Sequence, residues 1–164
     1  MTITPTIIID SREQVPLDFP NISTVIGTLT TGDYSIAGLE NIISVERKNH
    51  DDLLACIGRD RDRFKAELQR LRAYRFRLLV VEADAVTLET GDWRSSLHPS
   101  HVLGSLAAWT AQFALPVWLG GTHDACGRFV ERYLYQAART VAMDYKAAVD
   151  FIGEAREEKL AAPA

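Results

Sequence analysis

The sequence predicts a single α/β domain in which a mixed β-sheet is flanked by helices. Three observations predict it: a series of short apolar runs near the N-terminus, a later alternation of strand-like and helix-like segments, and a length of 164 residues, which suits one domain. Hydrophobic residues make up 47% of the chain and charged residues 24%, as in ordinary globular proteins. This composition argues against disordered, collagen-like and disulfide-scaffold proteins.

The first half of the chain predicts several strands followed by a long helix. The strands fall on short runs of β-branched and apolar residues, at 6–10, 25–30, 33–36 and 42–48. Proline residues indicate a loop over 11–20, and a turn is expected at 38–41. A stripe of apolar residues then predicts a helix over 51–74: Leu53, Ile57, Phe64, Leu68 and Leu71. The stripe lacks a member just after Gly58, so either the helix kinks there or its polar side chains point at something other than the core.

The second half of the chain alternates strands with helices. A dense apolar strand is predicted over 76–83, a helix over 99–113 and a short strand over 116–119. Thr122 is the expected N-cap of a last helix that runs to about residue 143. Strands that alternate with helices after an initial meander are typical of a mixed sheet covered by helices.

Charge is unevenly distributed along the chain. The formal net charge is −4, yet the segment 59–77 holds eight basic residues and only three acidic ones. A local basic surface of this kind can meet a phosphate backbone even on a protein that is acidic overall. A solvated helix face with ion pairs four residues apart is the alternative, and the sequence leaves it open.

The remaining global features favour an intracellular protein. Cys56 and Cys126 lie far apart and outside any CxxC pattern, which favours a reducing compartment. Residues 1–10 lack the basic segment of a signal peptide, and no apolar run approaches the length of a membrane span. We expect a cytoplasmic or nucleoid-associated protein with no membrane partner. No P-loop or dinucleotide fingerprint is present, so no nucleotide cofactor is expected.

Two acidic residues are predicted to face each other in the early strands. If 38–41 forms a four-residue hairpin loop, Asp33 lies directly across from Glu46, with Cβ atoms about 5 Å apart. Opposed carboxylates repel each other unless a cation lies between them, and oxygen ligands suit Mg²⁺ or Mn²⁺. Lys48 shares the strand face of Glu46 and could orient a water beside the metal. Such a set suits hydrolysis of a phosphodiester, although a hairpin with an ordinary cross-strand ion pair is the alternative.

The residues around this pair resemble a known nuclease signature. Gly32-Asp33-Tyr34, followed by the segment from Glu46-Arg47-Lys48 to Asp51-Asp52, resembles the GD-(x)n-ERK-x3-D signature of XPF-type nuclease domains, named after the xeroderma pigmentosum group F family. The similarity begins at Asp10-Ser-Arg12-Glu13. It implies a restriction-endonuclease-like core of the PD-(D/E)xK type, over 1–143, that cleaves DNA with a divalent metal. Residues 144–164 are then expected to form a helical or disordered tail, with fraying at its end.

The resemblance also implies the roles of the residues in the signature. Asp33 and Glu46 would bind the metal, with the main-chain carbonyl of Arg47 as a further ligand, and Lys48 would be the catalytic lysine. The chain holds the residue type that the motif requires at each of these positions. A non-catalytic module that binds DNA or protein with a partner is the alternative, and such modules lose the acidic ligands or the lysine.

The remaining roles lie around this centre. Asp10 and Glu13 would add acidity near the metals or their waters. Arg12 would contact phosphate or brace the site, as would the side chain of Arg47. Asp52 would close the site from the following helix.

Contacts with DNA and with a second copy are further expectations. We expect Arg59 and Arg63 to contact DNA, because the basic run starts directly behind the signature. Only about two dozen residues follow Ala138, too few for the tandem helix-hairpin-helix module of larger members, so selectivity for branched or flap DNA stays open. A homodimer through the C-terminal helices would use aromatic residues that could equally belong to the core: Trp109, Phe113, Tyr133 and Tyr135.

Overall fold

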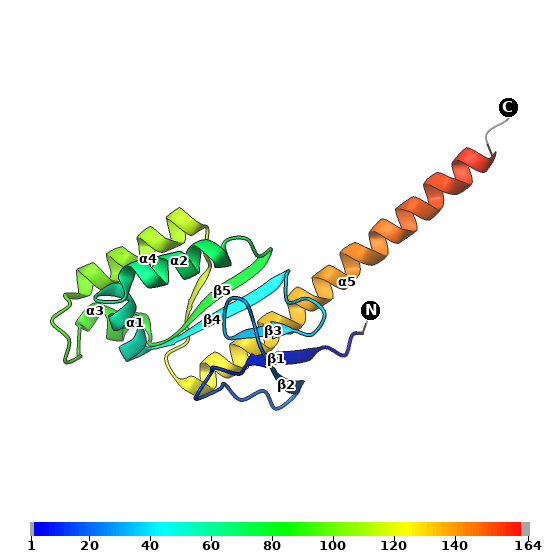
Figure 1. Cartoon of the computed structure of the whole chain (residues 1–164). Coiled ribbons are helices and arrows are strands. Elements are labelled where there is room, and N and C mark those ends of the chain that lie inside the picture. Colours follow the sequence, from blue (N-terminus) through cyan, green and yellow to red (C-terminus); the bar gives the residue numbers. More distant parts are fainter. Residues whose placement is uncertain (1, 162–164) are drawn as a thin grey trace.

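The protein folds as a six-stranded mixed sheet with helices on both faces (Figure 1). This computed structural model describes residues 2–161. The strands are β1 (Thr6–Asp10), β2 (Ser23–Gly27), β3 (Tyr34–Ile36), β4 (Ile43–Asn49), β5 (Phe76–Glu82) and β6 (Val117–Leu119). The helices are α1 (His50–Ile57), α2 (Arg61–Leu71), α3 (Ala85–Thr90), α4 (Pro99–Phe113) and α5 (His123–Ala161). The predicted fold class is confirmed.

The sheet has the order β2-β1-β3-β4-β5-β6. Strand β3 pairs antiparallel with both β1 and β4, and the other neighbours are parallel. As a result, β1, β4 and β5 all end at one edge of the sheet, where β3 begins. Side chains that follow or end these strands therefore gather at that edge.

Two hydrophobic cores cover the two faces of the sheet. Strand β5 serves both, because its side chains alternate: Leu78 and Val80 pack toward α5, whereas Leu79 and Val81 pack among α1, α2 and α4. The free thiols of Cys56 and Cys126 are buried, one in each core. Such a strand, apolar on both faces, is what the dense run 76–83 predicted.

Before the last helix, three elements differ from the prediction, although the first difference falls where a kink was one of the alternatives. The helix expected over 51–74 is broken into α1 and α2, and the amide of Gly58 closes α1 by donating to Leu54 O (3.0 Å). The strand expected over 25–30 lies at Ser23–Gly27, because the chain then turns so that Leu29 N donates to the Asp10 carboxylate (2.7 Å). Helix α3 has no counterpart in the prediction, although Asp84 caps it by accepting from Thr87 N (2.7 Å).

The last helix is longer than expected. It begins after the predicted N-cap Thr122, whose hydroxyl accepts from Ala125 N (3.2 Å), and continues past residue 143 to Ala161. Figure 1 shows α5 running along the sheet and then projecting beyond it. Asp144 is still tied to the domain by Arg75 (2.6 Å), whereas the apolar side chains of Tyr145 and Phe151 are exposed. Within residues 2–161, no helix is both long and apolar enough to cross a membrane.

The turn before β3 depends on a glycine. Gly32 has φ +80°, and a Cβ there would lie 2.9 Å from the carbonyl oxygen of Val45. We expect Gly32→Ala to destabilise the fold by about 1–3 kcal/mol, since both the left-handed backbone and the close approach oppose a side chain. Urea unfolding measures the effect.

The matched control is Gly104→Ala in α4, where a Cβ meets nothing within 4 Å. Helix propensity predicts that this change stabilises the protein by up to about 1 kcal/mol. Equal stability of the two variants would contradict the account of Gly32.

Candidate active site

The residues of the predicted signature meet at the edge where β1, β4 and β5 end. A cleft of about 340 Å³ opens there and is lined by Arg12, Glu13, Gln14, Val15, Asp33, Arg47, Lys48, Asn49 and Asp52. The segment after β1, the turn before β3 and the start of α1 supply its walls. Six of the expected site residues therefore line one cleft, and Glu46 lies buried beside it.

The hairpin register places the two acidic residues as predicted. Tyr34 pairs with Val45, so Asp33 and Glu46 are opposed at the next position. The backbone of β4 fixes Asp33 from two sides: its amide donates to Val45 O (2.8 Å), and its Oδ2 accepts from Arg47 N (2.7 Å). Asp33 is thus held by main-chain atoms of the strand that carries the other signature residues.

Buried Glu46 and partly buried Lys48 form an ion pair on the face of the sheet covered by α1 and α2. Glu46 is 2% exposed, and its Oε1 accepts from Lys48 Nζ. The ammonium of Lys48 also lies 5.1 Å from the centre of the Phe64 ring, which favours a cation. The second carboxylate oxygen, Glu46 Oε2, is buried with no hydrogen-bond partner.

Burial and mutual repulsion perturb these groups strongly. Burial raises the pKa of Asp33 to about 6, although the charge of Lys48 and the Arg47 amide oppose the rise. Burial and then the charge of Asp33 raise the pKa of Glu46 to about 8. Burial by itself lowers the pKa of Lys48, but the charges of Glu46 and Asp33 raise it above its usual value. Glu67 of α2 adds negative charge to this cluster and was not predicted from the sequence.

One observation supports a divalent cation beside Asp33 and Glu46. A buried carboxylate oxygen without a partner is costly, and a cation bound at Glu46 Oε2 would remove that cost. Asp33 and the carbonyl of Arg47 are the other ligands that the sequence predicts. Among residues 2–161, no group of three or more His, Cys, Asp and Glu side chains is arranged to hold a metal. The predicted set contains only two such side chains, so the metal site stays a prediction.

Asp10 fixes the corner after β1. Its Oδ1 accepts from Arg12 N (2.9 Å) and Arg12 Nε (2.6 Å), and its Oδ2 accepts from Leu29 N (2.7 Å). Burial tends to raise the pKa of Asp10, but these hydrogen bonds lower it below its usual value. Both carboxylate oxygens of Asp10 already accept hydrogen bonds within the protein. These contacts indicate that Asp10 anchors Arg12 and the turn at 28–33.

Arg47 points to the opposite face from Glu46 and Lys48. Its guanidinium is buried and donates to Glu13 Oε2 (3.2 Å) and to Glu82 Oε1 (2.7 Å). Of the two roles expected for this side chain, bracing the site is the one the contacts favour. Glu82 and its neighbour His123 were not predicted as site residues; the only signal for Glu82 is an acid at the end of a buried strand.

The arginines expected to contact DNA lie outside the cleft. Arg59 and Arg63 are both exposed and flank Asp60 at 3.1 and 3.5 Å. Arg59 borders a second hollow of about 440 Å³, which runs along α1 and also takes in Arg94. The hydroxyl-bearing Ser95 and Ser96 line it as well. This hollow begins at Asp51, next to Asp52 of the cleft, so the two are neighbours along α1.

The aromatic residues considered for a dimer interface separate into two groups. Trp109 and Phe113 are buried in the core against α1 and α2, which confirms the alternative expected for them. Tyr133 is partly buried and donates to Arg77 O (3.0 Å), while Tyr135 lines a different pocket. A homodimer through the C-terminal helices stays a prediction.

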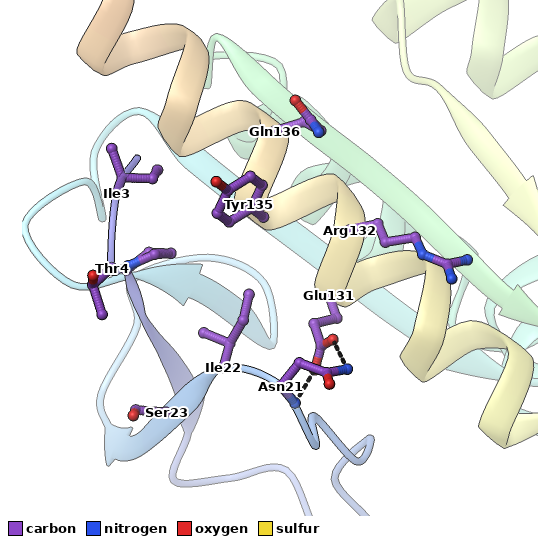
Figure 2. A pocket seen from close by; sticks show the side chains of 10 residues that line it. Ile3, Thr4, Asn21, Ile22, Ser23, Glu131, Arg132, Tyr135 and Gln136 are labelled. Atoms are coloured by element: carbon purple, nitrogen blue, oxygen red, sulfur yellow. Dashed lines mark hydrogen bonds between the residues drawn. The ribbon is translucent and has the colours of Figure 1, made fainter. Parts of the chain in front are cut away.

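That pocket lies at the start of β1 and β2, away from Asp33 and Glu46. Figure 2 shows Ile3, Ile22 and Tyr135 around it, with Asn21 joined to Glu131. Asn21 donates to both carboxylate oxygens of Glu131, at 2.7 and 3.0 Å. Because these bonds satisfy the buried carboxylate, the pocket carries no unpaired acid comparable to Glu46.

Comparison with known proteins agrees with this geometry. A family model, described as the ERCC4 domain, matches residues 9–133. The chain belongs to the ERCC4 domain family. This is the XPF nuclease family, so the resemblance drawn from the signature is confirmed. No curated protein matches the chain in sequence.

Two solved structures share the ERCC4 fold of this chain. XPF from Aeropyrum pernix superposes with a TM-score of 0.67 at 17% identity, covering 92% of this chain and 73% of that one. XPF from Aeropyrum pernix in complex with DNA gives a TM-score of 0.65 at 18% identity, covering 83% of this chain and 66% of that one. At these identities the similarity establishes the fold.

The perturbed carboxylates predict a specific pH dependence of stability. Their pKa values in the folded protein, about 6 for Asp33 and about 8 for Glu46, exceed the ordinary 3.8 and 4.5. The unfolded chain therefore binds fewer protons in this range, and the metal-free protein should lose about 1–3 kcal/mol of stability as pH rises from about 5 to 8. Urea unfolding at several pH values in EDTA measures this. Added Mg²⁺ should stabilise the protein more at pH 8 than at pH 6.

Glu46→Gln separates this effect from general pH sensitivity. The variant should show a flatter pH profile and little stabilisation by Mg²⁺, because the titrating and metal-binding group is gone. Glu89→Gln, at an exposed position on α3, is the matched control and should behave like the wild type. The idea fails if Glu46→Gln retains both the wild-type slope and the response to Mg²⁺.

Proposed function

We propose that this chain is a metal-dependent DNA endonuclease that hydrolyses phosphodiester bonds with the signature residues of the cleft. The observation that carries the proposal is the opposition of Asp33 at the cleft wall to buried Glu46, which has an oxygen without a partner beside a charged lysine. Membership of a nuclease family supports the reaction class. The similar structure in complex with DNA supports the substrate class, because that complex is described for an XPF protein of the same fold.

Asp33, Glu46 and the main-chain carbonyl of Arg47 would hold a Mg²⁺ or Mn²⁺ ion. When bound, the ion supplies charge neutralisation at the phosphate and a more acidic water. Asp33 contributes a carboxylate fixed by the β4 backbone, so its position costs no rearrangement.

Lys48 acts in this proposal as a hydrogen-bond donor. A general base would need a neutral amine, but the neighbouring carboxylates raise the pKa of Lys48 above its usual value. The ammonium therefore keeps its protons near neutral pH. It can orient the attacking water through an oxygen lone pair, or stabilise the charge that develops on the phosphate.

The scissile strand would continue from the cleft along α1. Arg59 and Arg94 border the hollow beside this helix, and Ser95 and Ser96 add donors that suit phosphate oxygens. Arg12 lies at the rim of the cleft itself and is largely exposed although it is bonded to Asp10. These residues would contact the backbone and would carry no sequence information.

Cleavage of end-labelled DNA tests the reaction. Single-strand, duplex, flap, fork and four-way-junction substrates are incubated with Mg²⁺, Mn²⁺ or EDTA. We expect metal-dependent cutting that falls at least about 100-fold in Asp33→Asn and in Lys48→Met, because each removes a group that acts on the transition state. Glu89→Gln should cut like the wild type, and the preferred substrate identifies the DNA structure.

Binding without cutting would favour the alternative function. If the wild type shifts these DNAs in gels but cleaves none with either metal, the chain acts as a binding module that needs a partner. If EDTA leaves cleavage unchanged, the proposed chemistry is wrong even though the nuclease activity is real.

The path along α1 predicts a change in salt dependence. The double variant Arg59→Gln/Arg94→Gln should bind DNA more weakly, and the slope of log K against log salt should fall by about 1 for each phosphate that the variant no longer neutralises. Its turnover at saturating DNA should stay close to that of the wild type. Fluorescence anisotropy at several salt concentrations measures the affinity and the slope, and the cleavage assay measures the turnover.

Arg132→Gln is the matched control, because Arg132 is exposed on α5 beside the pocket of Figure 2. It should leave the salt slope unchanged. A slope that falls equally in the control and in the double variant would indicate only a general effect of net charge.

A further inference from the structure

We infer that His123 is a positioning residue of the proposed nuclease. Its ring, protonated on both nitrogens, links the loop that carries Glu13 to Glu82, the carboxylate that binds Arg47. The inference rests on the proposed function for its effect on catalysis. It concerns a residue outside the signature, contributed by the first turn of α5. The geometry of its two ring nitrogens carries it.

Both ring nitrogens of His123 face hydrogen-bond acceptors. Nδ1 lies 2.7 Å from Glu82 Oε1, and Nε2 lies 3.2 Å from the carbonyl oxygen of Pro16. A carbonyl only accepts, and Glu82 Oε1 already accepts from Arg47 Nη1 at 2.7 Å. A neutral imidazole has one N–H and can satisfy only one of these acceptors. Both contacts form together only when the ring carries two protons.

These two contacts reach the cleft by two routes. Through Glu82, the ring acts on the guanidinium of Arg47, which lies between the proposed metal ligand Glu46 and Lys48 on the same strand. Through Pro16, it acts on the loop that places Val15 and Glu13 on the cleft wall. The two routes meet at Arg47, because the Glu13 carboxylate also accepts from Arg47 Nε (3.2 Å). His123 thus joins α5, the end of β5 and the loop after β1.

Other roles for the residue are already filled. The N-cap of α5 is Thr122, whose hydroxyl accepts from Ala125 N, so His123 is not needed to start the helix. The loop after Pro16 is anchored separately, because Leu17 N donates to the Tyr34 hydroxyl (2.9 Å). The specific contribution of His123 is therefore the link between Glu82 and the Pro16 carbonyl.

The surrounding charges act in both directions on the protonated ring. Glu82 at the end of β5 and Glu13 in the loop favour a cation, and Asp124 follows on the same helix. Arg47 of β4 and the positive end of α5 oppose it. The ring is 33% exposed and can exchange its proton with solvent. A ring with only one N–H would leave either Glu82 or the Pro16 carbonyl without a donor.

Kinetics of His123 variants test this role. His123→Ala removes both donors, whereas His123→Asn keeps a donor near the Nδ1 position and His123→Gln one near the Nε2 position. We expect kcat to fall about 10-fold in His123→Ala, with KM within about 2-fold of the wild type, and to recover in part in the amide variants. His101→Ala, at an exposed position on α4, is the control.

An NMR measurement separates this inference from the proposed function. In the metal-free wild type, NMR should show an N–H proton on each ring nitrogen of His123, and each hydrogen bond should slow the exchange of its proton with solvent, whether or not the chain cleaves DNA. A single protonated nitrogen there, a wild-type kcat in His123→Ala, or no recovery of kcat in the Asn and Gln variants overturns the inference. If His123→Ala does not fold, those two variants decide. A wild type without nuclease activity overturns the proposed function. The NMR result then still decides whether His123 links Glu82 to the Pro16 carbonyl.

Discussion

The structure depends on holding two carboxylates opposite each other, one buried and one at the wall of the cleft. The pairing of Tyr34 with Val45 sets the register that brings Asp33 and Glu46 together, and Lys48 balances only part of their charge. The remaining negative charge needs either a proton or a bound cation, which is why the pKa of each carboxylate is raised. A fold that maintains this arrangement sacrifices stability for it, and such strain is typical of functional sites. The rigid turn at Gly32 and the corner at Asp10 prevent the pair from relaxing apart.

One strand connects this pair to both cores. Alternation along β4 directs Glu46 and Lys48 toward α1 and α2, whereas Arg47 points toward α5. Of these three consecutive residues, Glu46 and Lys48 supply the proposed reactive groups on one face. Arg47 holds the strand in place on the other face through its ion pairs. Because Arg47 is bonded to Glu13 and Glu82, any shift of β4 that moved Lys48 would also break buried ion pairs. The middle residue of the signature has a physical reason to be an arginine: its fork reaches two carboxylates at once.

Much of the fold and of the central site could be predicted because the signals are local. Hairpin register follows from the loop at 38–41, so the opposition of Asp33 and Glu46 needed no tertiary information. The break after Gly58 was visible only as a gap in a stripe, since the sequence does not show that Asp60 N bonds back to Ala55 O. Glu82 and His123 escaped prediction for a different reason. Their contacts with Arg47 and Pro16 join residues 35 to 107 positions apart, and these depend on the parallel pairing of β4 with β5 and on where α5 docks.

The basic run shows why charge along a sequence is a poor guide to charge on a surface. Arg61 donates to Ser105 Oγ (2.9 Å), Arg75 pairs with Asp144 (2.6 Å), and Arg77 donates to Ala114 O (2.9 Å). These side chains join elements of the fold, which neither interpretation offered by the sequence anticipated for them. The cleft itself carries both signs of charge, because Asp33, Glu13 and Asp52 line it together with Arg12, Arg47 and Lys48. Arg12 and Arg47 are already bonded to carboxylates of the protein, so a phosphate beside Asp33 and Glu46 would face carboxyl groups until a cation bound. In the proposed nuclease, exposed arginines along α1 can hold the DNA backbone, but close approach of the scissile phosphate depends on the metal.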